Sequence, residues 1–173
     1  MDKPYNDYKL VHMNKNRTLV LGIGNSLLTD EGIGIHVINQ LQQDAATDET
    51  ADDIEYLDGG TLSFTLAEPI ESCDQLIVVD ASEIKDKPGS VRVFEDEAMD
   101  RFVSSGNKKS VHEVGLVDVM SIAMLSGSLP KKRALVGIQP DSLDWGSSPT
   151  ESVQQAIPVA CQQVKELIAR WRS

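Results

Sequence analysis

Residues 17–37, RTLVLGIGNSLLTDEGIGIHV, limit the possible folds more than any other stretch of the chain. Residues 18–21 are a short apolar run of strand-forming side chains, and GIGN at residues 22–25 predicts a sharp turn, because Gly and Asn tolerate positive φ angles. Thr-Asp-Glu at residues 29–31 predicts the start of an amphipathic helix, with a capping residue and acidic side chains in its first turn. A strand that feeds a helix through a glycine turn is the first half of a βαβ unit, and open α/β sheets bind ligands at the edge where such turns lie.

The rest of the chain alternates predicted strands with predicted helices. We expect strands at residues 54–57, 75–79, 91–94 and 134–138, and helices at residues 62–72, 110–124 and 150–171. QLIVV at residues 75–79 is apolar throughout, which predicts a central parallel strand, whereas residues 91–94 alternate as an edge strand does. The polar residues 95–109 predict a loop. This alternation is typical of an α/β fold, a sandwich of three layers.

Two helices have recognisable starting signals. The sequence S-x-x-E beginning at Ser110 matches a capping box, which places His112 in the first turn of a helix that continues to Met124. Thr150 is the expected N-cap of the last helix, and Pro158 predicts a kink in it.

Composition excludes several classes of protein. The chain has 173 residues, 40% of them apolar, which favours one globular domain, and we expect it at residues 17–173 after a polar N-terminal extension at residues 1–16. The net charge of −11 argues against binding to nucleic acid or to anionic membranes. No apolar run is long enough to span a bilayer. Cys73 and Cys161 lie far apart and suggest neither a disulfide framework nor a nucleophile, which favours a reducing compartment. We expect a soluble, cytoplasmic protein, and we expect it to be a monomer.

Three residues are candidates for a metal site. Glu31 lies in the predicted first turn of the first helix, Asp80 ends the central strand, and His112 lies at a helix N-terminus, where a neutral imidazole is favoured. Each has an ordinary structural explanation by itself: a helix-dipole partner, a loop cap and a surface histidine. All three, however, are expected at one edge of the sheet, and two carboxylates with one imidazole suit zinc, nickel, manganese or iron.

The GIGN turn also permits a second hypothesis, an α/β enzyme that binds a nucleotide. Asp58 ends the second strand, where a ribose-binding acid would lie. The dinucleotide fingerprint G-x-G-x-x-G, however, requires its third glycine at Leu27. We therefore expect no nucleotide cofactor.

Five segments of the chain carry a family resemblance. In order, they are LGIGNSLLTDEGIG, YLDGGT, LIVVDA, HEVGLVD and LVGIQP. In this combination and spacing they resemble the nickel–iron hydrogenase maturation endopeptidases, and the resemblance extends from Arg17 to the C-terminal helix. It implies a twisted, mostly parallel five-stranded sheet with helices on both faces. It also implies removal of a C-terminal peptide from the precursor of the hydrogenase large subunit, after nickel insertion.

The resemblance also implies the residues of the site. The family's metal-binding trio falls on Glu31, Asp80 and His112, the same three residues, and the family picture puts Asp58, Gly59, Gly60 and Thr61 near the substrate. The nickel is expected to arrive in the substrate, where it would lower the pKa of a water molecule and polarise the scissile carbonyl. Glu31 or Asp80 is a candidate general base. A non-catalytic module that binds the hydrogenase subunit is a third hypothesis, although none of the three ligand positions is lost.

Overall fold

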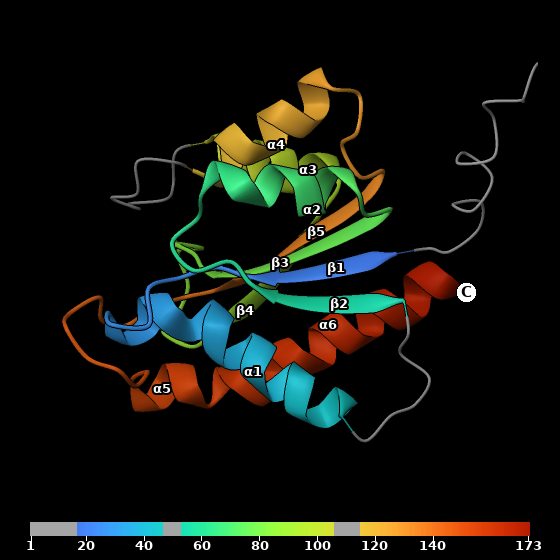
Figure 1. Ribbon diagram of the computed structural model, residues 1–173. Coiled ribbons are helices and arrows are strands. Elements are labelled where there is room, and N and C mark those ends of the chain that lie inside the picture. Colours follow the sequence, from blue (N-terminus) through green and yellow to red (C-terminus); the bar gives the residue numbers. More distant parts are fainter. Residues whose placement is uncertain (1–16, 47–52, 106–114) are drawn as a thin grey trace, which may run out of the picture.

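A five-stranded sheet forms the centre of the protein. The computed structural model describes residues 17–46, 53–105 and 115–173 (Figure 1). The sheet has the order β2-β1-β3-β5-β4, with the strands β1 (Thr18–Gly22), β2 (Ile54–Asp58), β3 (Gln75–Ala81), β4 (Val91–Glu95) and β5 (Lys132–Ile138). All neighbouring strands are parallel except β4, which runs antiparallel to β5 at the edge. The predicted α/β fold, with its mostly parallel sheet, is confirmed.

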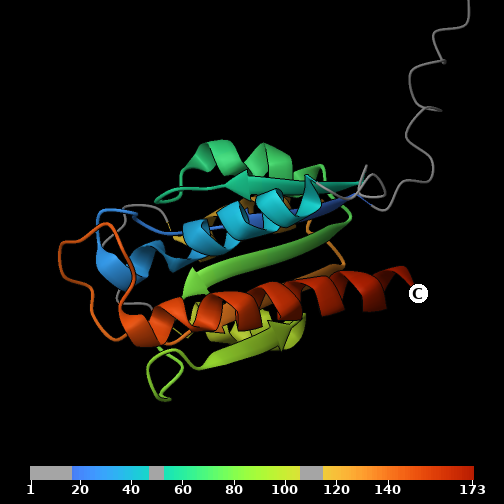
Figure 2. The ribbon, with the colours of Figure 1, turned by 90° about the horizontal axis from the view of Figure 1, so that it is seen from below.

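Helices cover both faces of the sheet. Figure 1 shows α2, α3 and α4 on one face and α1, α5 and α6 on the other, and Figure 2 looks onto the second face, along which α1 and α6 run. The helices are α1 (Ile33–Ala45), α2 (Ala67–Glu71), α3 (Glu97–Ser104), α4 (Leu116–Leu125), α5 (Glu151–Gln154) and α6 (Ala156–Arg172), with short 3-10 helices η1 (Thr29–Gly32) and η2 (Phe64–Leu66). Of the helices that the structure describes, none is both long and apolar enough to cross a bilayer.

Two buried apolar clusters separate the three layers. Along β3, Leu76 and Val78 belong to the cluster under α2 and α4, whereas Ile77 and Val79 belong to the cluster under α1 and α6. Side chains of a strand alternate between its two faces, so an apolar run such as QLIVV supplies both clusters at once. This explains why β3 is buried almost throughout.

The order in which strands are added to the sheet reverses between β1 and β3. From β1 the chain crosses to β2 on one side, and it then returns to β3 on the other. The last residue of β1, Gly22, is in register with Asp58 of β2 and with Val79 of β3. In an open α/β sheet the crevice for a ligand lies at such a switch point, beyond the carboxyl ends of the strands. The segments after β1, β2 and β5 gather at this edge, at the left of Figure 1.

The prediction of a loop over residues 95–109 is wrong in its central part, which forms α3. Met99 is fully buried there, and Phe102 stacks on Phe94 of β4 with 4.2 Å between ring centroids. The apolar residues of α3 recur at helical spacing among charged ones, but eight residues are too few for this pattern to dominate. Packing against the sheet makes the helix stable.

The predicted start of the next helix is also wrong. Gly115 is extended, with φ −93° and ψ 162°, so α4 begins at Leu116 and Ser110 is not its N-cap. The carboxylate of Asp118 instead accepts a hydrogen bond of 2.7 Å from the Gly115 N–H. Ser110 and His112 lie outside the described residues.

The last helix begins after Thr150, as predicted, but is interrupted at Gln155. Pro158, three residues later, has no N–H to donate to the carbonyl of Gln154, which ends α5. The hydroxyl of Thr150 does not cap α5, because it donates to Asp30 instead.

Candidate functional site

Backbone hydrogen bonds join the turns at the carboxyl edge into one unit. After β1, the N–H of Ile23 donates to the carbonyl of Val79 at 2.9 Å, and the N–H of Gly24 donates to the carbonyl of Gly60 at 2.8 Å. In return, the N–H of Gly59 donates to the carbonyl of Gly22 at 2.8 Å. The GIGN turn is thereby held between β3 and the DGGT turn, at the switch point of the sheet.

Glu31 lies in η1, whose backbone passes close to the GIGN turn, and it is partly exposed. A Cβ on Gly24, which has φ +150°, would lie 1.9 Å from the carbonyl oxygen of Glu31. Only a glycine therefore permits the backbone of Glu31 to pass so close to the turn. The predicted helix start at residues 29–31 is in fact this 3-10 turn, and α1 begins two residues after Glu31.

Asp80 lies near the end of β3 and is 3% exposed. Alternation along the strand puts it on the same face as Leu76 and Val78, the face that α2 and α4 cover. The strand β5 is parallel to β3, and α4 comes directly before β5, so α4 begins at the carboxyl edge and runs back across the sheet. Its first residue, Leu116, therefore lies at the same edge as Asp80. Glu31, in the segment after β1, and Asp80, near the end of β3, thus lie at the same edge of the sheet.

Close contact between α1 and the sheet depends on Gly34. A Cβ at this position would lie 2.3 Å from the carbonyl oxygen of Ile23 and 2.4 Å from that of Val79. In a dinucleotide fingerprint the third glycine allows the same close packing of helix and strand. That glycine would be expected at position 27, which is Leu27, whereas Gly34 comes seven residues later.

Four backbone N–H groups in and just after the GIGN turn donate to protein atoms. Ile23 and Gly24 donate to carbonyls of β3 and of the DGGT turn, and the N–H groups of Leu27 and Leu28 donate to the side chain and the carbonyl of Asn25. A phosphate-binding turn requires such donors to point at the ligand. These four N–H groups are therefore unavailable to a nucleotide.

Sequence reasoning missed the role of Asp30, which is fully buried next to Glu31. Its carboxylate accepts hydrogen bonds from the backbone N–H groups of Asp141 and Ser142 at 2.9 Å and of Thr150 at 2.7 Å. The Thr150 hydroxyl donates a fourth hydrogen bond, of 2.9 Å. Asp30 therefore does not act through a helix dipole: it anchors the loop after β5 to the segment that carries Glu31.

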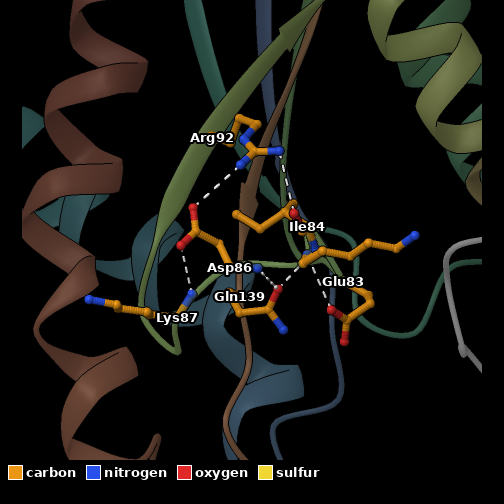
Figure 3. Close-up of polar contacts among 7 residues, drawn as sticks. Glu83, Ile84, Asp86, Lys87, Arg92 and Gln139 are labelled. Atoms are coloured by element: carbon orange, nitrogen blue, oxygen red, sulfur yellow. Dashed lines mark hydrogen bonds and ion pairs between the residues drawn. The ribbon is translucent and has the colours of Figure 1, made fainter.

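Gln139, the residue after β5, is a second anchor that sequence reasoning missed, and it holds the loop that follows Asp80 (Figure 3). It is 6% exposed, and its side-chain oxygen accepts hydrogen bonds from the N–H groups of Ile84 at 2.9 Å and Asp86 at 3.3 Å. Arg92 of β4 adds a hydrogen bond to the carbonyl of Ile84 and an ion pair with Asp86. In the sequence, Gln139 stands out only as part of the IQP segment at residues 138–140. Its neighbours in the sequence do not show that its side chain faces the loop after β3.

We expect Gln139→Ala to loosen the loop after β3 without unfolding the sheet. The buried N–H of Ile84 and the partly buried N–H of Asp86 would lose their acceptor, at a cost of about 1–3 kcal/mol. Hydrogen exchange at the amides of Ile84 and Asp86 should accelerate by roughly 10- to 100-fold, while exchange in β1 stays unchanged. Glu83→Gln, an exposed change on the same loop, is the control. Unchanged exchange at both amides would contradict the anchoring role.

Other predicted site residues are placed as follows. Asp58 is exposed, and its carboxylate accepts the N–H of Gly60 at 2.8 Å, which shapes the DGGT turn. His112 lies outside the described residues. Within residues 17–46, 53–105 and 115–173, no three His, Cys, Asp or Glu side chains form a cluster that could hold a metal ion.

The cysteines are free and unsuited to nucleophilic chemistry. Burial raises the pKa of the Cys73 thiol to about 12, and the nearby charge of Asp74 contributes. Burial likewise raises the pKa of Cys161 in α6. Because the thiolate is the reactive form, the raised pKa values disfavour both side chains as nucleophiles.

Comparison with known proteins identifies the family. The profile of a family described as hydrogenase maturation protease matches residues 35–167. The chain is 40% identical to the hydrogenase 2 maturation protease of Escherichia coli over 149 residues, which cover 86% of this chain and 88% of that protein. It is 37% identical to the hydrogenase expression/formation protein HupD of Bradyrhizobium diazoefficiens, over 90% of this chain and 80% of the relative.

Solved structures agree with this result. The hydrogenase maturating endopeptidase HybD from E. coli superposes with a TM-score of 0.77 at 40% identity, over 86% of this chain and 89% of that one. The [NiFe] hydrogenase maturation protease HybD from Thermococcus kodakarensis gives a TM-score of 0.72 at 25% identity, over 87% and 98% of the two chains. On the evidence of its sequence and its fold, the chain belongs to the hydrogenase maturation protease family and is an endopeptidase.

Proposed function

We propose that this endopeptidase removes the C-terminal peptide from the precursor of a nickel–iron hydrogenase large subunit once nickel has been inserted. The observation that carries the proposal is the position of two carboxylates at the carboxyl edge of the sheet: Glu31 in η1, after β1, and Asp80 near the end of β3. An open α/β sheet binds its ligand at this point. The names of the relatives, which refer to the formation and maturation of hydrogenases, support a hydrogenase as the substrate.

The proposed site recognises nickel that the substrate already holds. Glu31, Asp80 and His112 would offer two carboxylates and an imidazole, donors that nickel accepts, and the set contains no thiolate. Such a set of ligands binds a free nickel ion only modestly, but it can share a nickel ion that the substrate's own ligands hold. Cleavage would then require a substrate that already contains nickel. When bound, nickel supplies polarisation of the scissile carbonyl.

We propose that side chains of this protein act as the general base and contact the substrate peptide. Glu31 is partly exposed and can receive a proton from the attacking water, which makes it the better candidate for the general base, whereas Asp80 is almost fully buried. Residues 58–61, the DGGT turn, border the site through the hydrogen bonds of Gly59 and Gly60. We propose that the exposed side chains of Asp58 and Thr61 contact the peptide segment.

The proposal extends to the organisation of the chain. Residues 17–173 would act as a single peptidase domain, with residues 1–16 as an extension, and the enzyme would work as a monomer. The free thiols of Cys73 and Cys161 fit a reducing compartment such as the cytoplasm.

A cleavage assay tests the function. Purified precursor, either nickel-loaded or nickel-free, is incubated with the wild-type chain or with His112→Ala, and the loss of the C-terminal peptide is followed by mass spectrometry. We expect cleavage only of the loaded precursor and only by the wild type. A precursor that lacks its C-terminal peptide is the control for unrelated proteolysis.

Other outcomes separate the alternatives. Equal cleavage of both precursors would retain the peptidase but exclude recognition of nickel. Full activity of His112→Ala would remove this residue from the site. If the wild type binds the loaded precursor without cutting it, the chain is a recognition module and the proposed reaction is wrong.

A further inference from the structure

Three exposed apolar side chains lie on two segments that meet at the carboxyl edge of the sheet. Leu27, after the GIGN turn, is 60% exposed, and Leu143 and Trp145, in the loop after β5, are 47% and 81% exposed. We name these three residues the Trp145 ridge. A tryptophan so exposed keeps most of its apolar surface in water, and large apolar side chains gathered at one place mark interaction surfaces.

Hydrogen bonds fix the ridge in place. Leu28 and Trp145 form an antiparallel bridge, and the N–H of Gly146 donates to the carbonyl of Leu27 at 2.9 Å. A Cβ on Gly146 would lie 2.8 Å from a methyl carbon of Thr29, so a larger residue there would displace the Thr29 side chain or the loop. The exposure of Trp145 is therefore a property of a well-anchored loop.

The same contacts connect the ridge to the acidic site. The hydroxyl of Thr29 donates to the carbonyl of Ser142 at 2.6 Å, and the carboxylate of Asp30 holds the N–H groups of Asp141, Ser142 and Thr150. Glu31 is the next residue. A protein that contacts Trp145 therefore rests on the structure that positions Glu31.

We propose that the Trp145 ridge is the docking surface for the folded protein substrate of this endopeptidase. The inference rests on the proposed function, because the occupant is the hydrogenase large subunit precursor. A peptide bond can reach Glu31 and Asp80 only if the substrate covers the carboxyl edge, to which the ridge belongs. The exposed carboxylates of Asp141 and Asp144 flank the ridge, so the complementary surface presents an apolar patch with basic side chains beside it.

The test combines kinetics with fluorescence. We expect Trp145→Ala to lower kcat/KM for nickel-loaded precursor by about 10- to 30-fold, mainly through KM, as is typical when an exposed aromatic anchor is removed from an interface. Leu125→Ala, at a side chain 89% exposed at the far end of α4, is the matched control and should change kcat/KM less than about twofold. Both variants should unfold at the wild-type temperature.

Fluorescence reports contact directly, because the chain has only two tryptophans and Trp171 is buried at 8% exposure. The difference between wild type and Trp145→Phe isolates the signal of Trp145. We expect acrylamide to quench this signal in the free enzyme and to quench it several-fold less once loaded precursor is bound.

Three results would overturn the inference. In the first, the wild type cleaves the loaded precursor, but Trp145→Ala has an unchanged KM and acrylamide quenches the Trp145 fluorescence as strongly in the complex as in the free enzyme. This result would leave the proposed function intact. The second is a concentration-dependent dimer that Trp145→Ala abolishes, which would assign the ridge to a second copy of the chain. The third is a wild type that neither binds nor cleaves the loaded precursor, which would overturn the proposed function and this inference with it.

Discussion

Glu31→Gln is expected to slow cleavage of the nickel-loaded precursor by about 10²–10⁴-fold. The amide has nearly the shape of the carboxylate, but it can neither accept a proton from water nor offer a charged oxygen to the ion. Because Glu31 is partly exposed and its neighbours in η1 are held by backbone hydrogen bonds, the fold should be unaffected. Single-turnover cleavage measured by mass spectrometry gives the chemical step, and a pull-down of the precursor measures binding separately.

The control for this experiment is the same substitution at Glu83, an exposed residue of the loop after β3. Glu83→Gln should cleave at the wild-type rate. If Glu31→Gln also cleaves at that rate, Glu31 is neither base nor ligand, and Asp80 becomes the candidate base. If Glu31→Gln loses binding and cleavage in equal measure, its main role is recognition of nickel.

Asp30→Ala is expected to produce the largest loss of stability among single changes at the site, about 3–5 kcal/mol of the free energy of unfolding. The substitution leaves three backbone N–H groups and the Thr150 hydroxyl without their common acceptor. Asp30→Asn should recover part of the loss, because its carbonyl oxygen can accept the three hydrogen bonds made to one carboxylate oxygen, while its amide nitrogen would face the N–H of Thr150. Urea unfolding with an unchanged m-value measures the loss.

Asp141→Ala provides the matched control, since its exposed carboxylate lies on the same loop and only its backbone N–H contacts Asp30. This variant should lie within about 0.5 kcal/mol of the wild type. The prediction also has a functional part: Asp30→Ala should lose activity at temperatures where it is still folded, because Glu31 is the next residue. A stable and fully active Asp30→Ala would show that the buried carboxylate holds nothing in place.

The elements that sequence patterns predicted correctly are those with a strong local signal. The five strands, their three-layer packing and the position of Asp80 near the end of β3 follow from apolar runs and from the glycine turns between them. The short helix α3 was missed because its few apolar residues stand among polar ones. The start of α4 was misplaced because a capping box is a weak signal when a glycine follows it.

The sequence by itself determined that the chain is an α/β protein with acidic residues at the switch point of its sheet. That result depends on periodicity and on turn chemistry, which act over a few residues and are therefore visible in the order of residues. Only the tertiary structure decided which loops meet. Asp30 accepts hydrogen bonds from residues 111 to 120 positions away, and no local pattern separates it from a helix-capping acid. The same is true of Gln139 and of Trp145, because burial and exposure are set by what the fold packs against each side chain.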